Sequence, residues 1–274
     1  MGLSFKNSPL VEIIAEMRWD LPWVNQSSVQ DIGSVVPMSS TLANQHEEFY
    51  MRFGSKVAAA GYQRIERLVP PNFSQLPYHP VYRFRHNAEN KDKGARLYQL
   101  GAGLFSVNAT PPYKSWAEFE PMVSVGVDAL LQSRADNEKS NIFTSISLRY
   151  IDAFKKELTD GRSIAEFMDA LGFQIKTPDA IIRHASNVAE IQPFLQLTVP
   201  VAIGQLNISI ADGAVSNEPA IIMDTIASNT AEIGCSKEEV MAAFEQTHSL
   251  ILSMFFDLTK PLHEHMQPEG SGQC

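Results

Sequence analysis

Arg149 is the residue whose type and setting most suggest chemistry, because it interrupts a strand-like stretch, SISLRYIDAF. An arginine on a sheet face suits anion recognition, since its planar guanidinium binds a carboxylate or phosphate through two parallel hydrogen bonds. Such a site needs a second cation, and Arg18 in the earlier stretch EMRWD holds the matching position. The structural alternative is a pair with Glu16 or Glu12 of a neighbouring strand, worth about 0–1 kcal/mol when exposed.

Alternation along the same stretch separates a polar side from an apolar side. Arg149 shares the polar side with Ser145 and Ser147. The residues predicted to face the core are Ile146, Leu148 and Tyr150. The candidate residues of the sheet for binding a ligand or partner are Glu16, Arg18, Arg149 and Asp152.

Aromatic residues offer a second candidate surface. Tyr113 and Trp116 follow Pro111 and Pro112, just after a predicted strand. Packing beneath the start of the next helix is the ordinary explanation. A patch that binds a partner protein is the alternative, because aromatic side chains exposed together mark interaction sites.

Motifs that would identify an enzyme are missing from the sequence. QLGAGLFS has Ser106 where a dinucleotide-binding fingerprint needs its third glycine, and it leads into a strand instead of a helix. The phosphate-binding loop G-x-x-x-x-G-K-[ST] and the nucleophile motif G-x-S-x-G are absent. His263 and His265 point away from each other on a helix, so they do not predict a metal site. We therefore expect no catalytic residues, no cofactor and no enzymatic activity.

Several isolated titratable residues could serve either a structural or a functional role. His248 lies in the apolar stripe of the last predicted helix, where a hydrogen-bonded core histidine and a general base are the two interpretations. Asp212, Glu218 and Asp224 fall at predicted strand ends and turns, where carboxylates usually face water. Cys235 and Cys274 lack the C-x-x-C spacing of a zinc or redox site.

The predicted strands and helices that position these residues occur in the same order in both halves of the chain. PLVEIIAEMRW alternates as a strand, and a helix is predicted over the apolar stripe from Leu42 to Ala60. Three short strands (VYRFRH, ARLYQL, GLFSVNA) and a helix starting at Trp116 complete this half. The second half repeats the order with NIFTSISLRYIDAF, SIAEFMDALGF, IQPFLQLTVPVA, QLNISIA and AIIMDTIAS. Its long C-terminal helix starts with a capping box, Ser236 and Glu239.

This order predicts an α+β fold with an antiparallel-rich sheet of about eight strands and helices on one face. We expect one domain over residues 1–274, with a flexible tail at 267–274. EMRWD aligns with SLRYID, which favours two pseudo-repeats at about 5–135 and 141–266. Two similar halves can also arise independently from a small set of elements.

Composition restricts the function classes. The chain has 274 residues, 44% of them apolar, and a net charge of −9. This acidity argues against general nucleic-acid binding, which depends on clustered Lys and Arg, although VYRFRH and KDKGAR hold local basic residues. No apolar run approaches the roughly 20 residues that span a bilayer, and MGLSFKNSPL lacks a signal-peptide pattern. We therefore expect a cytoplasmic protein that does not enter membranes.

Several spaced segments resemble a sporadically distributed bacterial protein family with no assigned activity. They are PLVEIIAEMRW, YQLGAGLFSVNATPPYKSWAEF, ISLRYIDAF and HSLILSMFFDLT, in the same order along almost the whole chain. Relatives often read LRYIN where this chain reads LRYID, at Asp152. The resemblance implies a bacterial origin and carries over no catalytic residue.

Three functions remain. The first is a bacterial accessory protein, such as an immunity, antitoxin-like or phage-defence component, that binds a protein encoded by a neighbouring gene; a homodimer is a further form of association. The second is a sensor of a small ligand or nucleotide built around Arg18 and Arg149. The third is a nucleic-acid binder, because a duplicated β-α-β-β-β-α plan is similar to the saddle of TATA-binding proteins, although fold does not fix function.

Overall fold

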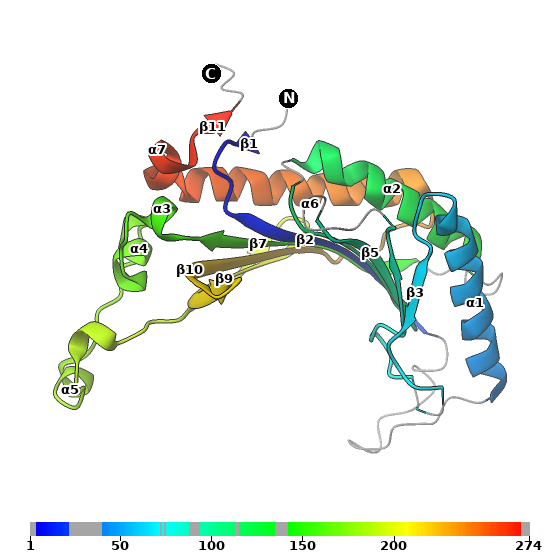
Figure 1. Cartoon of the computed structure of the whole chain (residues 1–274), viewed down its shortest axis with the longest axis horizontal. Coiled ribbons are helices and arrows are strands. Elements are labelled where there is room, and N and C mark those ends of the chain that lie inside the picture. Colours follow the sequence, from blue (N-terminus) through cyan, green and yellow to red (C-terminus); the bar gives the residue numbers. More distant parts are fainter. Residues whose placement is uncertain are drawn as a thin grey trace.

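The computed structural model describes residues 4–21, 40–71, 73, 75–87, 94–112, 115–134 and 142–269, with only the backbone described for 40–45 and 189. A nine-stranded sheet forms the centre of the molecule (Figure 1). In spatial order its strands are β3 (Arg64–Arg67), β4 (Tyr82–Arg85), β5 (Arg96–Gly101), β6 (Leu104–Ala109), β2 (Leu10–Trp19), β7 (Phe143–Phe154), β10 (Glu218–Asn229), β9 (Gly204–Val215) and β8 (Leu195–Val201). Every neighbouring pair is antiparallel.

Three long helices cover one face of this sheet: α1 (Ser40–Ala58), α2 (Trp116–Ser133) and α6 (Lys237–Leu258). Helix α6 packs on β7 and β10, and α2 packs on β6. The sheet bends at its β3 end in Figure 1, and α1 follows the bend on the outer side. The short helices are α3 (Lys156–Thr159), α4 (Ile164–Ala170), α5 (Asp179–Ile182), η1 (Val188–Glu190), η2 (Lys260–Leu262) and α7 (His263–Met266).

Period-two alternation assigns the two faces of the sheet, because successive strand residues point to opposite sides. One row of paired residues crosses all nine strands on the helix-covered face: Ile65, Phe84, Tyr98, Val107, Ala15, Leu148, Ala227, Leu206 and Val199. The five from Phe84 to Leu148 are fully buried, and only the two edge residues are exposed. The adjacent row on the other face is Glu66, Arg83, Gln99, Ser106, Glu16, Ser147, Ser228, Gln205 and Pro200. Eight of these nine side chains are polar, so we call this side the polar face.

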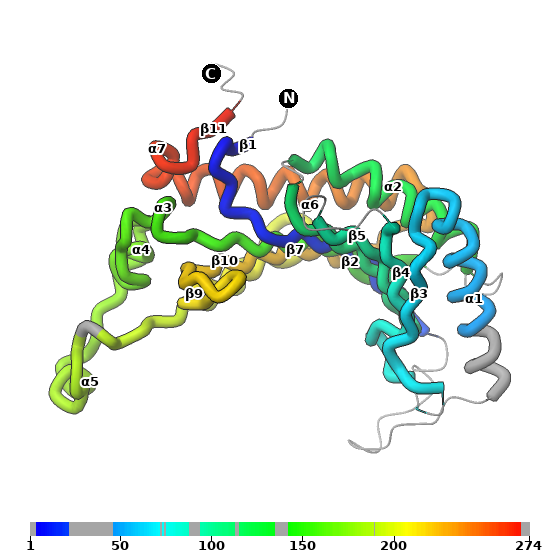
Figure 2. The backbone as a smooth tube through the Cα atoms, in the orientation of Figure 1, coloured from blue at the N-terminus to red at the C-terminus, as the bar shows by residue number. Residues whose placement is uncertain are grey.

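A second, two-stranded sheet ties the ends of the described chain together. Strand β1 (Ser4–Phe5) pairs with β11 (Pro268–Glu269), as the backbone trace also shows (Figure 2). The side-chain amide of Asn7 donates to the backbone carbonyl of His265 over 2.8 Å. The tail predicted at 267–274 is therefore held by the N-terminal strand as far as Glu269, and its remaining residues lie outside the described ranges.

The predicted fold class is confirmed: an α+β chain with a large antiparallel sheet and a long C-terminal helix. The strand beyond the predicted eight is β3, and β1 and β11 form the small additional sheet. Strands β3 to β6 and β2 from the first half lie on one side of the sheet, and β7 to β10 lie on the other. The two opening strands, β2 and β7, pair with each other at the centre. That the halves arose by duplication stays a prediction.

Candidate functional site

Strand β7 carries the charged stretch that the sequence singled out, and it places Arg149 and Asp152 on opposite faces. Arg149 lies on the polar face, where its side chain is 42% exposed. Asp152 lies on the helix side and is only 3% exposed. Residues of a strand whose numbers differ by an odd value point to opposite faces of the sheet. Arg149 and Asp152 differ by three, so they belong to different sites.

On the polar face, Arg149 forms a two-pronged pair with Asp224 of β10. The Nε and Nη2 atoms of Arg149 donate to Oδ1 and Oδ2 of Asp224 over 2.8 and 2.5 Å. These hydrogen bonds raise the pKa of Arg149, so the guanidinium stays charged. The expected partners, Glu16 and Glu12, are wrong, and Asp224 does not simply face water. Sequence reasoning missed this pair because Asp224 lies 75 residues away, on a strand whose neighbour in the sheet was unknown.

Arg18 lies on the same face as Arg149 and is also paired. Its Nε donates to Glu16 Oε1 over 2.7 Å, and its guanidinium lies 5.8 Å from the ring centre of Tyr78. A shallow hollow on this face is lined by Ile14, Glu16, Arg18, Ser145, Ser147, Arg149, Ile226 and Ser228. The structure therefore brings Arg18, Glu16 and Arg149 together, but each arginine already has a carboxylate of its own.

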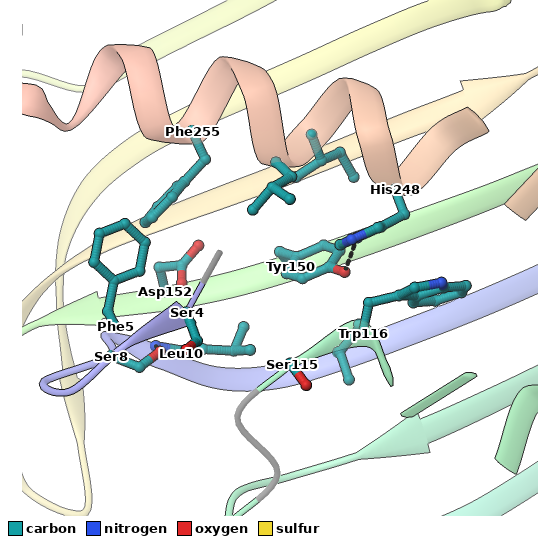
Figure 3. A pocket seen from close by; sticks show the side chains of 13 residues that line it. Ser4, Phe5, Ser8, Leu10, Ser115, Trp116, Tyr150, Asp152, His248 and Phe255 are labelled. Atoms are coloured by element: carbon teal, nitrogen blue, oxygen red, sulfur yellow. Dashed lines mark hydrogen bonds between the residues drawn. The ribbon is translucent and has the colours of Figure 1, made fainter. Parts of the chain in front are cut away.

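On the helix side, a cavity opens between β2, β7 and α6 (Figure 3). It offers about 60 Å³ to the centres of water molecules. Asp152 points into this cavity beside Phe5 and Phe255, whose rings meet edge to face at 5.9 Å. Burial, and to a lesser extent the charge of Asp224, together raise the pKa of Asp152 to about 8. The carboxyl group is therefore mostly protonated at neutral pH.

A hydrogen-bonded pair of residues forms another wall of the cavity. The hydroxyl of Tyr150 lies 2.9 Å from Nδ1 of His248, as the dashed line in Figure 3 marks. Burial lowers the pKa of His248 and raises that of Tyr150, so both groups are neutral near pH 7. The interpretation of His248 as a hydrogen-bonded histidine is confirmed. The position of His248 in a cavity wall could not be predicted from the sequence, because the apolar stripe of α6 does not show which residues pack opposite it.

Trp116 completes the same wall from the start of α2. Its ring stacks on His248 with centres 5.0 Å apart, and its Nε1 donates to Glu245 Oε2 over 2.6 Å. The aromatic junction of the sequence thus packs between α2 and α6 at the cavity. Tyr113, the other aromatic candidate, lies outside the described residues.

Other kinds of site find no support in the described part of the chain. No group of three or more His, Cys, Asp and Glu side chains within the described ranges is arranged to hold a metal ion. Cys235 forms no disulfide within the described ranges, and its Sγ accepts a hydrogen bond from Nη1 of Arg134 over 3.5 Å, while Cys274 lies outside those ranges. None of the helices seen there combines the length and hydropathy that crossing a bilayer requires.

Comparison with known proteins gives no relative: no protein-family model, curated protein sequence or solved structure matches this chain.

Proposed function

We propose that this chain is a bacterial cytoplasmic accessory protein, of the immunity, antitoxin-like or phage-defence kind, that binds a protein partner through its polar face. The observation that carries the proposal is the polar row that crosses all nine strands on the side opposite the three long helices. A broad polar surface on a rigid sheet is suited to recognising another folded surface.

The surroundings of Arg149 support a protein partner more than a small anion. Ile14 and Ile226 flank Arg149 in its own cross-strand row, so aliphatic and charged groups alternate there. This mixture is typical of protein interfaces, in which arginine is enriched. Because Asp224 fixes the guanidinium, little side-chain freedom is lost when a partner binds.

The two alternatives receive less support. A sensor of a phosphate or carboxylate needs cations that are free to pair, whereas Arg18 and Arg149 are bound to Glu16 and Asp224. A nucleic-acid saddle needs an excess of basic groups, and the centre of this face carries three carboxylates, including Glu12, for two arginines.

The experiment is site-specific photo-crosslinking in cells of the source organism. A photoreactive residue replaces Ser147, at the centre of the polar face, or Val125, an exposed residue of α2 on the other side. We expect one dominant protein adduct from position 147, whose purified protein binds the unmodified chain, and no such adduct from position 125. Adducts to nucleic acid, equal adducts from both positions, or no adduct at all would contradict the proposal.

A further inference from the structure

Asp152 is an acid buried without a partner among the described residues. It is 3% exposed, and no hydrogen bond from a described residue reaches its carboxyl group. An ionised carboxylate in such a place is strongly disfavoured unless a cation joins it. The carboxyl group of Asp152 points into the cavity under α6 (Figure 3).

Among the described residues that line the cavity there is no lysine or arginine. The titratable groups at the cavity wall are Tyr150 on β7 and Glu245 and His248 on α6, whereas Asp224 of β10 acts on Asp152 from the polar face, where Arg149 pairs with it. The tyrosine and histidine are neutral, and Glu245 is a further carboxylate, so these wall groups bring no positive charge to Asp152. A cation bound beside Asp152 would supply the positive charge that stabilises its ionised carboxylate.

The rest of the wall is apolar and aromatic. Phe5 and Phe255 stand beside the carboxyl group, and Trp116 stands beyond Tyr150 (Figure 3). The faces of aromatic rings attract organic cations, and aromatic cages recognise substituted ammonium groups. Aliphatic contacts come from Leu10, Ile13, Ile251 and Leu252.

We propose that this cavity binds a small protonated amine with a compact apolar body, whose ammonium group donates to Asp152 while its body contacts the aromatic and aliphatic wall. The 60 Å³ of available space suits a molecule of about four to six non-hydrogen atoms, since a single water needs about 10–15 Å³. The site lies behind β7, on the opposite side of the strand from Arg149.

Binding displaces one proton at neutral pH. The carboxyl O–H bond of Asp152 breaks, its proton passes to solvent or buffer, and the remaining carboxylate accepts a hydrogen bond from the ammonium N–H. Below the pKa of Asp152 this exchange makes binding weaker, by up to about tenfold per pH unit. The amine itself stays protonated throughout, so the pH dependence belongs to the protein.

The experiment is isothermal titration calorimetry of the full chain with matched probes: n-butylamine, butan-1-ol and butyrate, with benzylamine as a larger amine. At pH 8.5 we expect an amine to bind with a Kd of about 1 mM or tighter, as suits ligands this small, and at least about tenfold more tightly than the alcohol. Between pH 8 and pH 6 the affinity falls, and the heat varies with the buffer because a proton is released. Butyrate does not bind.

The matched variants are Asp152→Asn, which keeps the shape but removes the charge, and Asp212→Asn, which changes an exposed aspartate of β9. We expect the first to lose the preference for the amine and the second to retain it. Failure of both amines to bind, equal binding of butan-1-ol, affinity independent of pH, or an unchanged preference in Asp152→Asn would each overturn the proposal. The tests on the unmodified chain decide the matter even where Asp152→Asn does not fold.

Discussion

At the scale of single residues, the alternation of side chains along β7 places Arg149 and Asp152 on opposite faces of the sheet. Arg149 faces an open surface and is paired, whereas Asp152, three residues on, faces a cavity and has no hydrogen-bond partner among the described residues. Alternation predicted the side of Arg149 correctly from the sequence. It could not supply Asp224 as the partner, because strand order and register are long-range properties. The same alternation separates Arg149 from Asp152, so the different sides of these two residues are predictable from the sequence, whereas their surroundings are not.

Asp152→Asn tests the buried acid through stability. The folded-state pKa of about 8 lies above the ordinary 3.8, so the protonated fold is fully stable below pH 4 and loses stability as pH rises toward 8. The loss is on the order of 3–6 kcal/mol by the rule of about 1.4 kcal/mol per pKa unit. We expect Asp152→Asn to melt at a higher temperature than the parent at pH 8.5 and to lack this part of the pH dependence. Melting curves from pH 4 to 9 measure it, and a variant that is less stable at pH 8.5 would contradict the assignment.

Arg149→Ala should barely change stability. The pair with Asp224 is partly exposed, so solvent screens it and its net contribution is about 0–1 kcal/mol. We expect a fall in Tm of less than about 3 °C, and a similar result for Arg18→Ala, whose side chain is 45% exposed. Thermal melting provides the check. A fall of more than about 10 °C for Arg149→Ala would show that the pair is structural, and the binding role of the polar face would lose its basis.

At the scale of elements, local signals predicted well where the chain has strong periodicity. The alternation in β2 and β7 and the stripe of α6 gave their type correctly, because each buries one full side. Strand β3, with the sequence RIER, has one apolar residue and no local strand pattern, so only pairing with β4 reveals it. The cavity was not predictable, because its walls come from four separate segments of the chain, from Ser4 to Phe255, whose packing is a long-range property.

Helix α6 offers the sharpest element-scale test. Its predicted capping box is confirmed: Ser236 Oγ accepts from the backbone N–H of Glu239 over 3.2 Å, and the Glu239 carboxylate accepts from the backbone N–H of Ser236. We expect Ser236→Ala to lower the free energy of unfolding by about 1 kcal/mol, and Ser236→Asp to retain most of it. Urea denaturation measures both. If the alanine and aspartate variants lose stability equally, the cap does not set the start of this helix.

At the scale of the whole molecule, the structure joins the two halves through their opening strands. Strand β2 pairs with β7 along most of its length, and α2 of the first half contacts α6 of the second. Neither half keeps its sheet edge covered without the other. That the chain behaves as one domain stays a prediction, which this arrangement makes testable.

Limited proteolysis should therefore release no stable half. We expect the intact chain to be cut progressively, without a resistant fragment ending near residue 140, because such a cut would expose β2 or β7 and the apolar side of α6. Mass spectrometry of a trypsin time course gives the answer. An isolated, folded fragment of either half would instead support two domains.

The binding role of the polar face is tested most directly by one affinity comparison. Arg149→Ala and Arg52→Ala remove arginines of equal exposure, 42% in each case, from the polar face and from α1. With the partner protein captured through position 147, we predict that Arg149→Ala weakens binding at least about tenfold, because charge-assisted contacts are lost, while Arg52→Ala binds like the parent. Equal affinities of the two variants would contradict the account.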